Sequence, residues 1–459
     1  MSTHGAKQDL WYQMVGCTDR VKETELRQAL LRYGLNVSPL GDRVPAGPGL
    51  VFFGEGTEQG CDCLKVYSRG GYERVFAIAM SMATLPPTDL WRWLEAGASD
   101  VFGWHDVENP ASIIAARFER WRRIDQLVES PRVKESLVGE SPTWIALLRQ
   151  LVEVAHFTQA SVLLTGESGT GKELAARLIH FLDPRPHKQH LVVLDCTTVV
   201  RELSGSEFFG HEKGAFTGAI SSREGAFARA DKGTLFLDEV GEMVVTMQAE
   251  LLRVVQEHVY KRVGSNTWRT TDFRLICATN RDLKHEEGQG TFRRDLYYRI
   301  ASWVISLPPL RERKEDILLL ARHFLHQIYP DRDPPGFDRA VRDYLLTRDY
   351  PGNVRELRQL VRRMAWRHVG EGPISLGDVA EEERSGIAWT SNDWRDDGFD
   401  RAIRRALSVG VGLKEISKAA ADTAVRIALD EGEGNLKQAA QRLGVTDRAL
   451  QMRRANNQK

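Results

Sequence analysis

The chain has 459 residues, and its 63 Lys and Arg residues are balanced by 63 Asp and Glu residues. This balance excludes a uniformly basic nucleic-acid coat protein but leaves room for one small basic domain. The length predicts about two to four domains. No apolar run approaches the ~18 residues of a membrane span, and the first residues lack the apolar core of a signal peptide. The five cysteines are scattered, so we expect a cytoplasmic protein with no membrane association and no disulfide framework.

Residues 1–125 carry the pattern of a small α/β domain, in which apolar runs alternate with helical stretches. The predicted parallel strands are Leu10–Val15, Leu50–Phe53, Val75–Ala79 and Asp100–Phe102. Residues 113–128 then place apolar side chains at steps of three and four, which predicts a helix with one apolar stripe. That stripe suits packing within the chain or against the same helix of a second copy, and residues 126–136 would form a linker helix.

Residues 162–182 have the strand, loop and helix context of a phosphate-binding loop. Its glycines allow backbone N–H groups to surround phosphate oxygens at a helix N-terminus. The candidate nucleotide-binding residues are Gly166, Glu167, Ser168, Gly169, Thr170, Gly171, Lys172 and Glu173. Lys172 would bridge the β- and γ-phosphates of ATP, whereas Glu173 stands where a metal-binding Ser or Thr is usual.

A second apolar run, GTLFLDE, ends in Asp238 and Glu239, as expected at the carboxyl end of a buried strand. Asp238 would hold Mg²⁺, often through water, and Glu239 would polarise an attacking water. The two acids follow the phosphate-loop lysine by some 66 residues. The predicted activity is therefore ATP hydrolysis.

Five segments occur in the order typical of one family. They are GESGTGKE, FFGHEKGAFTGA, GTLFLDE, LPPLRERKEDI and YPGNVREL. Residues 137–378 thereby resemble the central AAA+ domain of sigma-54-dependent transcription activators, the bacterial enhancer-binding proteins. The resemblance implies a P-loop ATPase with a helical lid at about residues 311–378. A Glu directly after the phosphate-loop lysine is also usual in that family.

The hexapeptide GAFTGA is almost specific to that family. The resemblance implies that Phe216 and Thr217 lie at the tip of a loop that contacts sigma-54 when ATP is bound. Flanking glycines allow a tight loop, and an exposed Phe provides an apolar anchor. The candidate contact residues are Gly214, Ala215, Phe216, Thr217, Gly218 and Ala219.

The resemblance also implies the residues that complete the ATP site. Arg293 and Arg299 match arginines that reach the nucleotide of a neighbouring subunit, where a cation neutralises charge in the transition state. Thr279 and Asn280 match the first sensor near the γ-phosphate, and Arg355 matches the second sensor in the lid. Since arginines acting in trans need a neighbour, the resemblance implies a homo-oligomer, from a dimer to a hexameric ring.

One position departs from the family pattern. The family usually carries Asn, which pairs with the catalytic glutamate, where this chain has Asp195. An ionised Asp cannot donate a hydrogen bond, and two nearby carboxylates repel each other or share a proton. We therefore list Asp195 among the catalytic candidates, and expect slowed hydrolysis or altered coupling to the Phe216 loop.

The C-terminal segment is basic and helical in pattern, with six basic residues and one acidic residue from Asn435 onward. Residues 435–450 predict a helix, a turn at Gly444 and a second helix. This resembles the Fis-type helix-turn-helix domain that ends most such activators, and it implies binding to double-stranded DNA at an upstream activator site. The candidate DNA contacts are Thr446 as a helix cap, Arg448 and Gln451 as base readers, and Arg453 and Arg454 on phosphates.

The N-terminal domain resembles a response-regulator receiver at residues 94–102. A receiver needs an acid pair after its first strand and an aspartate after its third, but Gly16-Cys17-Thr18 and Gly54 stand there. The lysine expected after the last strand is replaced by Gly103-Trp104-His105. We predict a receiver-like domain without a phosphoacceptor.

The predicted fold class is multidomain α/β. It comprises a receiver-like domain (1–125), a linker helix (126–136), the AAA+ ATPase domain (137–378), a second linker (379–411) and an all-α helix-turn-helix domain (412–459). The main hypothesis is a DNA-binding regulator that uses ATP hydrolysis in a hexameric ring to remodel the closed complex of sigma-54 RNA polymerase holoenzyme into the open complex. The alternative is a DNA-bound regulator whose ATP site is a slow switch and which acts without sigma-54.

Overall fold

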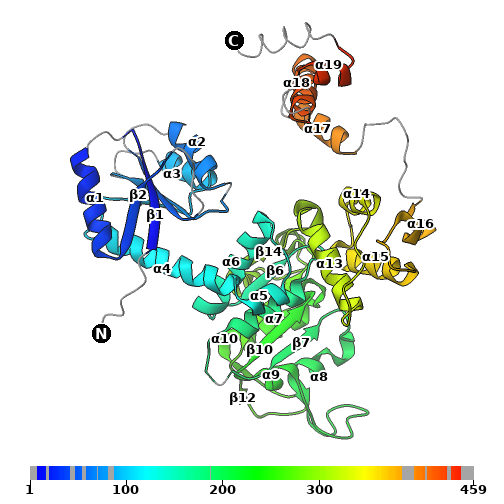
Figure 1. Ribbon diagram of the computed structural model, residues 1–459. Helices are drawn as coiled ribbons and strands as arrows, with labels where there is room; N and C mark the ends of the chain where they lie inside the picture. Colours follow the sequence, from blue (N-terminus) through cyan, green and yellow to red (C-terminus); the bar gives the residue numbers. More distant parts are fainter. Residues whose placement is uncertain are drawn as a thin grey trace. The chain divides into compact units, whose positions relative to one another are not determined.

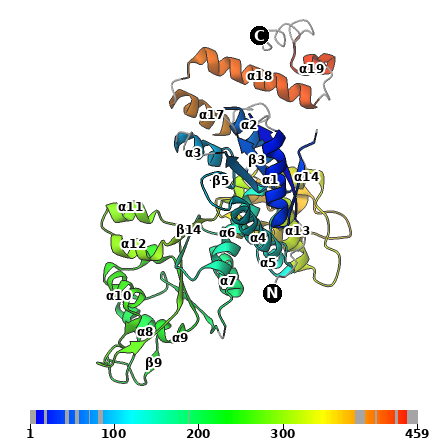
Figure 2. The same cartoon turned by 90° about the vertical axis from the view of Figure 1, so that its left-hand side faces the viewer.

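The computed structural model describes residues 8–16, 20–41, 47–53, 58–69, 71–80, 87–186, 188–384, 397–408, 411–431 and 436–445. The chain divides into two compact units, Met1–Ala380 and Glu381–Lys459, each of which is considered by itself. Figures 1 and 2 show the ribbon from two directions. No helix in the described ranges is long and apolar enough to cross a membrane.

The first unit begins with a parallel five-stranded sheet of order β2-β1-β3-β4-β5. Its strands are β1 (Gln8–Val15), β2 (Leu35–Pro39), β3 (Gly49–Phe53), β4 (Val75–Ala79) and β5 (Asp100–Gly103). Its helices are α1 (Arg20–Arg32), α2 (Glu58–Tyr67), α3 (Pro87–Glu95) and α4 (Pro110–Val128). The strand order is that of doubly wound receiver-type folds, and the four predicted strands are confirmed. Strand β2 was not predicted, because only Leu35 and Val37 of its residues are buried.

Trp11 of β1 is buried on one face of this sheet. The connection from β2 to β3 has nine residues, fewer than the dozen or more that a parallel crossover ordinarily uses. The Trp11 indole lies against Gly49, where a Cβ atom would be 2.1 Å from the ring, and its Nε1 donates to the Gly47 carbonyl at 2.9 Å. Trp11 also packs edge-on against Tyr67, with ring centroids 5.5 Å apart. The Trp11 indole thus packs against the start of β3 and against α2.

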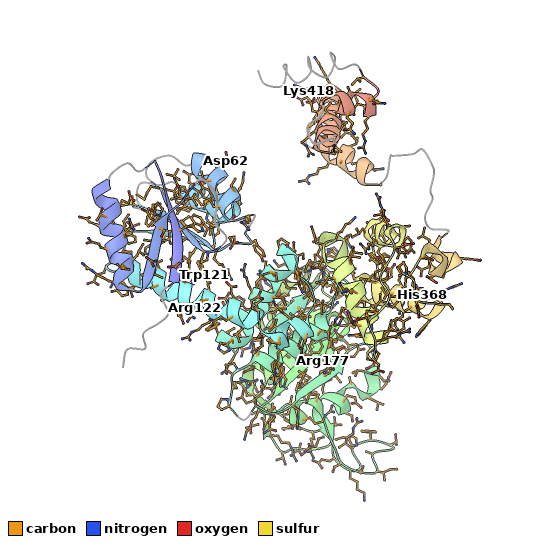
Figure 3. All side chains as sticks on the ribbon, viewed as in Figure 1. Asp62, Trp121, Arg122, Arg177, His368 and Lys418 are labelled. Carbon is orange, nitrogen blue, oxygen red and sulfur yellow. The ribbon has the colours of Figure 1, made fainter. Side chains whose placement is uncertain are left out.

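Helix α4 carries the predicted apolar stripe, and the stripe is buried within the chain. Its buried residues are Ala111, Ile114, Phe118, Trp121, Ile124 and Val128. Trp121 packs on Phe76 of the sheet at 5.3 Å and lies where α4 leaves the N-terminal sheet (Figure 3). Helix α4 continues past the predicted boundary at residue 125 and contacts α6 of the ATPase region. Of the two uses considered for the stripe, the structure shows packing within the chain.

The ATPase region is built on a second parallel sheet, of order β14-β6-β13-β10-β7. Its strands are β6 (Val162–Thr165), β7 (Leu191–Asp195), β10 (Thr234–Asp238), β13 (Arg274–Thr279) and β14 (Trp303–Ser306). The surrounding helices are α5 (Pro131–Ser136), α6 (Pro142–Phe157), α7 (Lys172–Leu182), α8 (Ser204–Phe209), α9 (Ala226–Arg229), α10 (Val245–Glu257), α11 (Leu283–Gly288) and α12 (Arg294–Ile300). Strands β6, β10 and β13 are nearly fully buried, as their apolar runs predict.

Two short hairpins and a helical lid complete the first unit. The hairpins pair β8 (Gly210–His211) with β9 (Arg223–Glu224), and β11 (Val259–Tyr260) with β12 (Arg269–Thr270). The lid consists of α13 (Asp316–Ile328), α14 (Arg339–Thr347) and α15 (Asn353–Arg367). Helix α15 packs on α13 through buried residues such as Leu357, Leu360 and Val361. The predicted lid is therefore present at the predicted place.

The second unit is helical in its described residues. It contains α16 (Glu381–Arg384), α17 (Asp397–Ser408), α18 (Leu413–Glu431) and α19 (Leu436–Arg442). Helix α17 lies within the segment predicted as a linker. Ala439 and Ala440 of α19 are buried against Ala428 of α18, and Gly444 turns the chain with φ of 66°. The predicted recognition residues Thr446, Arg448, Gln451, Arg453 and Arg454 lie outside the described residues.

Candidate functional site

The phosphate loop has the geometry that its sequence predicts. Gly166, Gly169 and Gly171 have φ values of 145°, 79° and 108°, in the range that favours glycine. Lys172 begins α7 and is 7% exposed. Its Nζ donates to the Gly166 carbonyl at 2.9 Å and lies 3.5 Å from a carboxylate oxygen of Glu239. The loop thus places one buried cation beside Glu239, the second of the two predicted acids.

The acids stand at the carboxyl ends of neighbouring strands. Asp238 ends β10, and in the parallel register it lies beside Asp195 at the end of β7. Glu239 follows in the left-handed region, with φ of 48°, a strained conformation typical of functional sites. Its Oε2 accepts from the backbone N–H of Asn280 at 3.0 Å. Asn280 therefore contacts the catalytic candidate Glu239 through its backbone.

Asp238 is suited to a divalent cation. Burial, and next the Glu239 carboxylate, raise the pKa of Asp238 above its ordinary value, so a nearby cation would favour its charged form. Mg²⁺ usually binds through one or two carboxylates together with substrate phosphates. A half-buried carboxylate beside a phosphate loop fits that donor set.

Asp195 faces its own turn. Its Oδ1 accepts from the N–H of Thr197 at 2.8 Å and from the Thr197 hydroxyl at 2.7 Å. Asp195 also makes a smaller contribution to the raised pKa of Asp238. Glu239 is held instead by the Lys172 ammonium and by the Asn280 N–H. Both groups can donate a hydrogen bond to a carboxylate, whereas an ionised Asp cannot.

Five of the eight phosphate-loop candidates, together with Arg355, line a cleft between the sheet and the lid. A cavity of about 260 Å³ contains the phosphate-loop residues Ser168, Gly169, Gly171, Lys172 and Glu173 together with Asp238, Glu239 and Arg355. A second cavity of about 260 Å³, more apolar, shares Gly171, Leu174, Phe324, Val354 and Arg358 with it and extends to Leu137 and Val138. Sequence reasoning missed this apolar end, because residues such as Leu137, Val138 and Phe324 lie outside the recognised motifs and come together only in the fold.

The side chains matched to the two sensors, Thr279 and Arg355, have different surroundings. Thr279 is fully buried, and its hydroxyl accepts from the Arg281 N–H at 3.0 Å. Thr279 thus shapes the turn after β13. Arg355 of the lid donates to the Ser168 hydroxyl at 3.2 Å, beside the phosphate loop, as its sensor assignment implies.

Arg293 and Arg299 do not line the cleft of their own chain. Arg293 is exposed and donates to both oxygens of Asp295, at 3.0 and 2.6 Å. Arg299 donates to the Val255 carbonyl at 2.9 Å and lines a different cavity, of about 400 Å³, together with His258. An arginine outside its own cleft is what a residue acting in trans requires.

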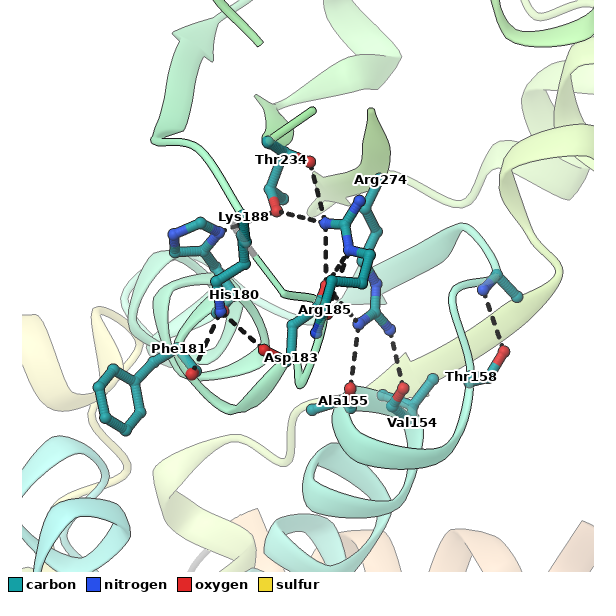
Figure 4. A network of polar contacts seen from close by, with 12 residues as sticks. Val154, Ala155, Thr158, His180, Phe181, Asp183, Arg185, Lys188, Thr234 and Arg274 are labelled. Atoms are coloured by element: carbon teal, nitrogen blue, oxygen red, sulfur yellow. Dashed lines mark hydrogen bonds and ion pairs between the residues drawn. The ribbon is translucent and has the colours of Figure 1, made fainter. Parts of the chain in front are cut away.

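A buried ion-pair network fixes the amino-terminal end of β13 (Figure 4). Arg274 and Asp183 are both fully buried, with 3.3 Å between them, and Arg274 also donates to the carbonyls of Val154 and Ala155 at the end of α6. Arg185 chelates Asp183 and reaches the Gly233 carbonyl at 2.9 Å. Sequence reasoning gave no signal for this network. It ties α6, α7 and two central strands together.

The GAFTGA segment forms the tip of the β8–β9 hairpin. Gly214 and Gly218 have φ of 80° and 104°, and the Gly214 N–H donates to the Ala219 carbonyl at 2.9 Å to close the loop. Phe216 is 37% exposed and packs edge-on against His211, and Thr217 is exposed.

The neighbouring hairpin supports the base of this loop. The Glu212 N–H donates to the Val263 carbonyl at 3.0 Å. Arg262 pairs with Glu212 at 3.3 Å and with Glu224 at 3.2 Å. These contacts connect the base of the loop to the neighbouring hairpin, while Phe216 and Thr217 at the tip are exposed.

Comparison with known proteins agrees with this architecture. Residues 137–306 match the family described as the Sigma-54 interaction domain, and residues 311–388 match the AAA+ ATPase lid domain. The transcriptional regulatory protein ZraR of Klebsiella oxytoca is 43% identical over 328 residues, which cover 71% of this chain and 69% of that protein. The Nif-specific regulatory protein of Bradyrhizobium diazoefficiens is 48% identical over 281 residues, covering 61% of this chain and 47% of that protein.

A solved structure shares the fold. The crystal structure of NtrX from Brucella abortus in complex with ATP covers 97% of this chain and 98% of that one, with a TM-score of 0.50 and 23% identity. Together the sheet, lid, phosphate loop and contact hairpin define an ATP-binding AAA+ transcriptional regulator. The chain belongs to the sigma-54-dependent transcriptional activators. This family membership supports the main hypothesis over a regulator that acts without sigma-54.

Proposed function

We propose that this chain hydrolyses ATP in a ring of identical subunits and uses the energy to remodel sigma-54 RNA polymerase from the closed to the open promoter complex. It would act in the cytoplasm, where bacterial promoter DNA lies. One observation carries the proposal: the hairpin with Phe216 and Thr217 is inserted between β7 and β10, the strands that end in Asp195 and Asp238. The contact loop is therefore connected at both ends to strands that end at the ATP site.

The cis residues supply binding and activation of water. Lys172 and the phosphate-loop N–H groups would hold the phosphates of ATP, the nucleotide bound by the related NtrX structure. Asp238 would hold Mg²⁺, which when bound neutralises charge on the phosphates. Glu239, held by Lys172 and the Asn280 N–H, would orient the attacking water and accept its proton.

The trans residues make the ring part of the active site. Arg293 and Arg299 are outside their own cleft, so they would reach the nucleotide of the adjacent subunit and stabilise charge in the transition state. Hydrolysis would then require at least two subunits, and a hexamer is the assembly that the family resemblance implies. The C-terminal helices would bring the ring to double-stranded DNA upstream of the promoter.

The N-terminal domain would report a signal other than its own phosphorylation. Arg149 on α6 donates to Asp125 of α4 at 2.7 Å and to the Tyr72 carbonyl at 2.6 Å. These contacts join the N-terminal domain to the helix whose last carbonyls receive Arg274. A change in the N-terminal domain would thus be felt at the ATPase sheet.

Capture of sigma-54 tests the proposal. Purified sigma-54 is offered to the immobilised chain with ATP, ADP, or ADP with an aluminium or beryllium fluoride that mimics the γ-phosphate. We expect capture with the mimic and its loss in Thr217→Ala, whereas Thr267→Ala, on the neighbouring hairpin loop, is the matched control and should keep it. Absence of capture in every nucleotide state, from protein that still binds DNA, would contradict the proposal.

A further inference from the structure

The first residues of lid helix α15 lie directly against the phosphate loop. The Asn353 Nδ2 donates to a Glu167 carboxylate oxygen at 3.0 Å and to the Ser168 carbonyl at 3.0 Å. One residue further on, the Val354 N–H donates to the Gly169 carbonyl at 3.1 Å. Two consecutive lid residues, Asn353 and Val354, therefore donate hydrogen bonds to three consecutive residues of the phosphate loop, Glu167 to Gly169.

Asn353 uses both ends of its side-chain amide. Its oxygen accepts from the Leu310 N–H at 2.8 Å, while its nitrogen serves the phosphate loop. The residue is fully buried, and its φ of 52° lies in the left-handed region that Asn adopts more readily than most residues. The position thus needs a side chain that donates, accepts and tolerates this backbone conformation.

Glu167 is the anion around which these contacts gather. Arg311 donates to its two oxygens at 2.8 and 2.6 Å, a bidentate pairing. Arg311, and then Asn353, lower the pKa of Glu167 to about 2, so the carboxylate is ionised throughout the neutral range. We call Glu167, Arg311 and Asn353 the lid clamp.

At the lid clamp, the backbones of the lid and of the phosphate loop are in direct contact. A Cβ atom at Gly169 would lie 2.3 Å from the Gly352 carbonyl oxygen, so the two backbones are already in close contact. Arg355 follows Asn353 by two residues and reaches the Ser168 hydroxyl. Moving α15 away from the loop would therefore break the Asn353 bonds and withdraw Arg355 together.

We propose that Asn353 is a positioning residue for the nucleotide: through Glu167 and Arg311 it sets the phosphate loop and Arg355 as one unit, so that lid movement controls nucleotide affinity and release. The inference rests on the proposed ATP hydrolysis for its kinetic readout. Asn353 does not touch the reacting atoms, so it acts on binding and release more than on the chemical step.

Asn353→Asp is the most informative substitution. It keeps the size, the acceptor and the tolerance for positive φ, but it replaces the donor with a second carboxylate beside Glu167. We expect the KM for ATP and the dissociation constant of a fluorescent ADP analogue to rise about 10-fold, with kcat within about 3-fold of the wild type, because a charge-assisted hydrogen bond becomes a repulsion. The defect should shrink as the pH falls from 8 to 6, since two close carboxylates share a proton and a donor returns.

Two further variants separate positioning from folding. Adding Glu167→Gln to Asn353→Asp reverses the polarity of the pair, because the new amide can donate to the new carboxylate, and should recover most of the lost affinity. Gln359→Glu places the same extra charge on an exposed position of α15 and should behave as the wild type.

The outcomes divide cleanly. Unchanged KM and ADP affinity in Asn353→Asp would overturn the inference, and so would a loss of folded signal by circular dichroism that neither low pH nor the second substitution repairs. A wild-type chain that hydrolyses no ATP would instead contradict the proposed function. In that case the ADP affinities of the same variants still decide whether the lid clamp positions the nucleotide.

Discussion

The described part of the chain contains two parallel five-stranded sheets that differ at their carboxyl edges. In the ATPase sheet, β7 and β10 end in acids, β6 leads to the phosphate loop with Lys172, and β13 leads to the N–H that holds Glu239. In the N-terminal sheet, the last residues of the strands are apolar or otherwise uncharged: Val15, Pro39, Phe53, Ala79 and Gly103. Both sheets have buried central strands and helices on their faces.

The comparison shows that burial maintains the fold while a few residues at the strand ends provide the chemistry. Phe52, Phe76 and Ile78 pack the N-terminal sheet as tightly as Leu235 and Ile276 pack the ATPase sheet. Core packing requires apolar volume and tolerates any residue beyond the strand end. A receiver-like domain can therefore keep its architecture without the acids of phosphotransfer.

The largest expected effect on the ATPase rate comes from removing Arg299, which does not line the nucleotide cleft of its own chain. Arg299→Ala should lower kcat for ATP by about 10³-fold, because an arginine supplied in trans contributes 10³–10⁵-fold in related phosphoryl-transfer systems. Arg294→Ala, an exposed neighbour on α12, is the matched control and should retain activity. Mixing Arg299→Ala with Lys172→Ala should restore part of the activity, whereas no recovery in any mixture would argue against catalysis between subunits.

Removing the base should have the next largest effect. Glu239→Gln keeps the hydrogen bond from Asn280 but cannot accept a proton, so kcat should fall by about 10²–10³-fold. ATP binding, followed with a fluorescent analogue, should stay within a few-fold of the wild type. Activity close to the wild type would show that another group activates the water.

Asp195→Asn should have a smaller effect of opposite sign. The change removes a carboxylate that raises the pKa of Asp238, and it places an amide donor beside the end of β10. We expect kcat to increase about 2- to 5-fold, since one neighbouring charge is lost while the Asn oxygen still accepts from Thr197. Steady-state ATPase assays measure it, and a decrease would show that the Asp195 carboxylate itself is needed.

The buried network predicts a pH dependence of stability. Burial, and next Lys188, lower the pKa of His180 to about 4, whereas an unfolded His titrates near 6.5. The unfolded state therefore binds up to about one proton more between these values, so stability is lost as the pH falls from about 6.5 to about 4 and is independent of this group above. His180→Gln should flatten the pH dependence of the urea midpoint, and His105→Gln, exposed in the N-terminal domain, should not.

For the N-terminal domain, we expect no phosphorylation by a small phosphodonor. Incubation of the chain with acetyl phosphate and Mg²⁺ should add no phosphoryl group to the N-terminal domain, because the sequence lacks the receiver acids. Intact-mass measurement checks this, with an ordinary receiver as positive control. A stoichiometric phosphoryl adduct would remove the contrast between the two sheets.

Much of the fold follows from the sequence because buried parallel strands leave unmistakable apolar runs. All four strands predicted in the N-terminal domain are present, and so are the strands on both sides of the ATP site. Strand β2 escaped prediction since only alternate residues are buried. The burial of the α4 stripe within the chain also needed the structure, because the same pattern would serve a dimer.

The site was predictable only where chemistry concentrates in a short motif. Lys172, Asp238 and Glu239 stand in continuous segments, and the structure brings them to one cleft. Asn353 and Arg311 contact Glu167 across more than 140 residues of chain, so no local pattern could join them. The backbone role of Asn280 was equally hidden, because a residue letter does not reveal which N–H meets a carboxylate.

We propose that ATP hydrolysis by this chain opens a sigma-54 promoter. The most direct test is open-complex formation by purified sigma-54 RNA polymerase on a duplex promoter, detected by permanganate reactivity of unpaired thymines. We expect open complexes with the wild type and ATP, and none with Thr217→Ala, with Glu239→Gln or with a non-hydrolysable analogue. Two results would contradict this proposal. One is open complexes formed by a Glu239→Gln variant that has lost ATP hydrolysis. The other is the absence of open complexes with a wild-type chain that hydrolyses ATP and captures sigma-54.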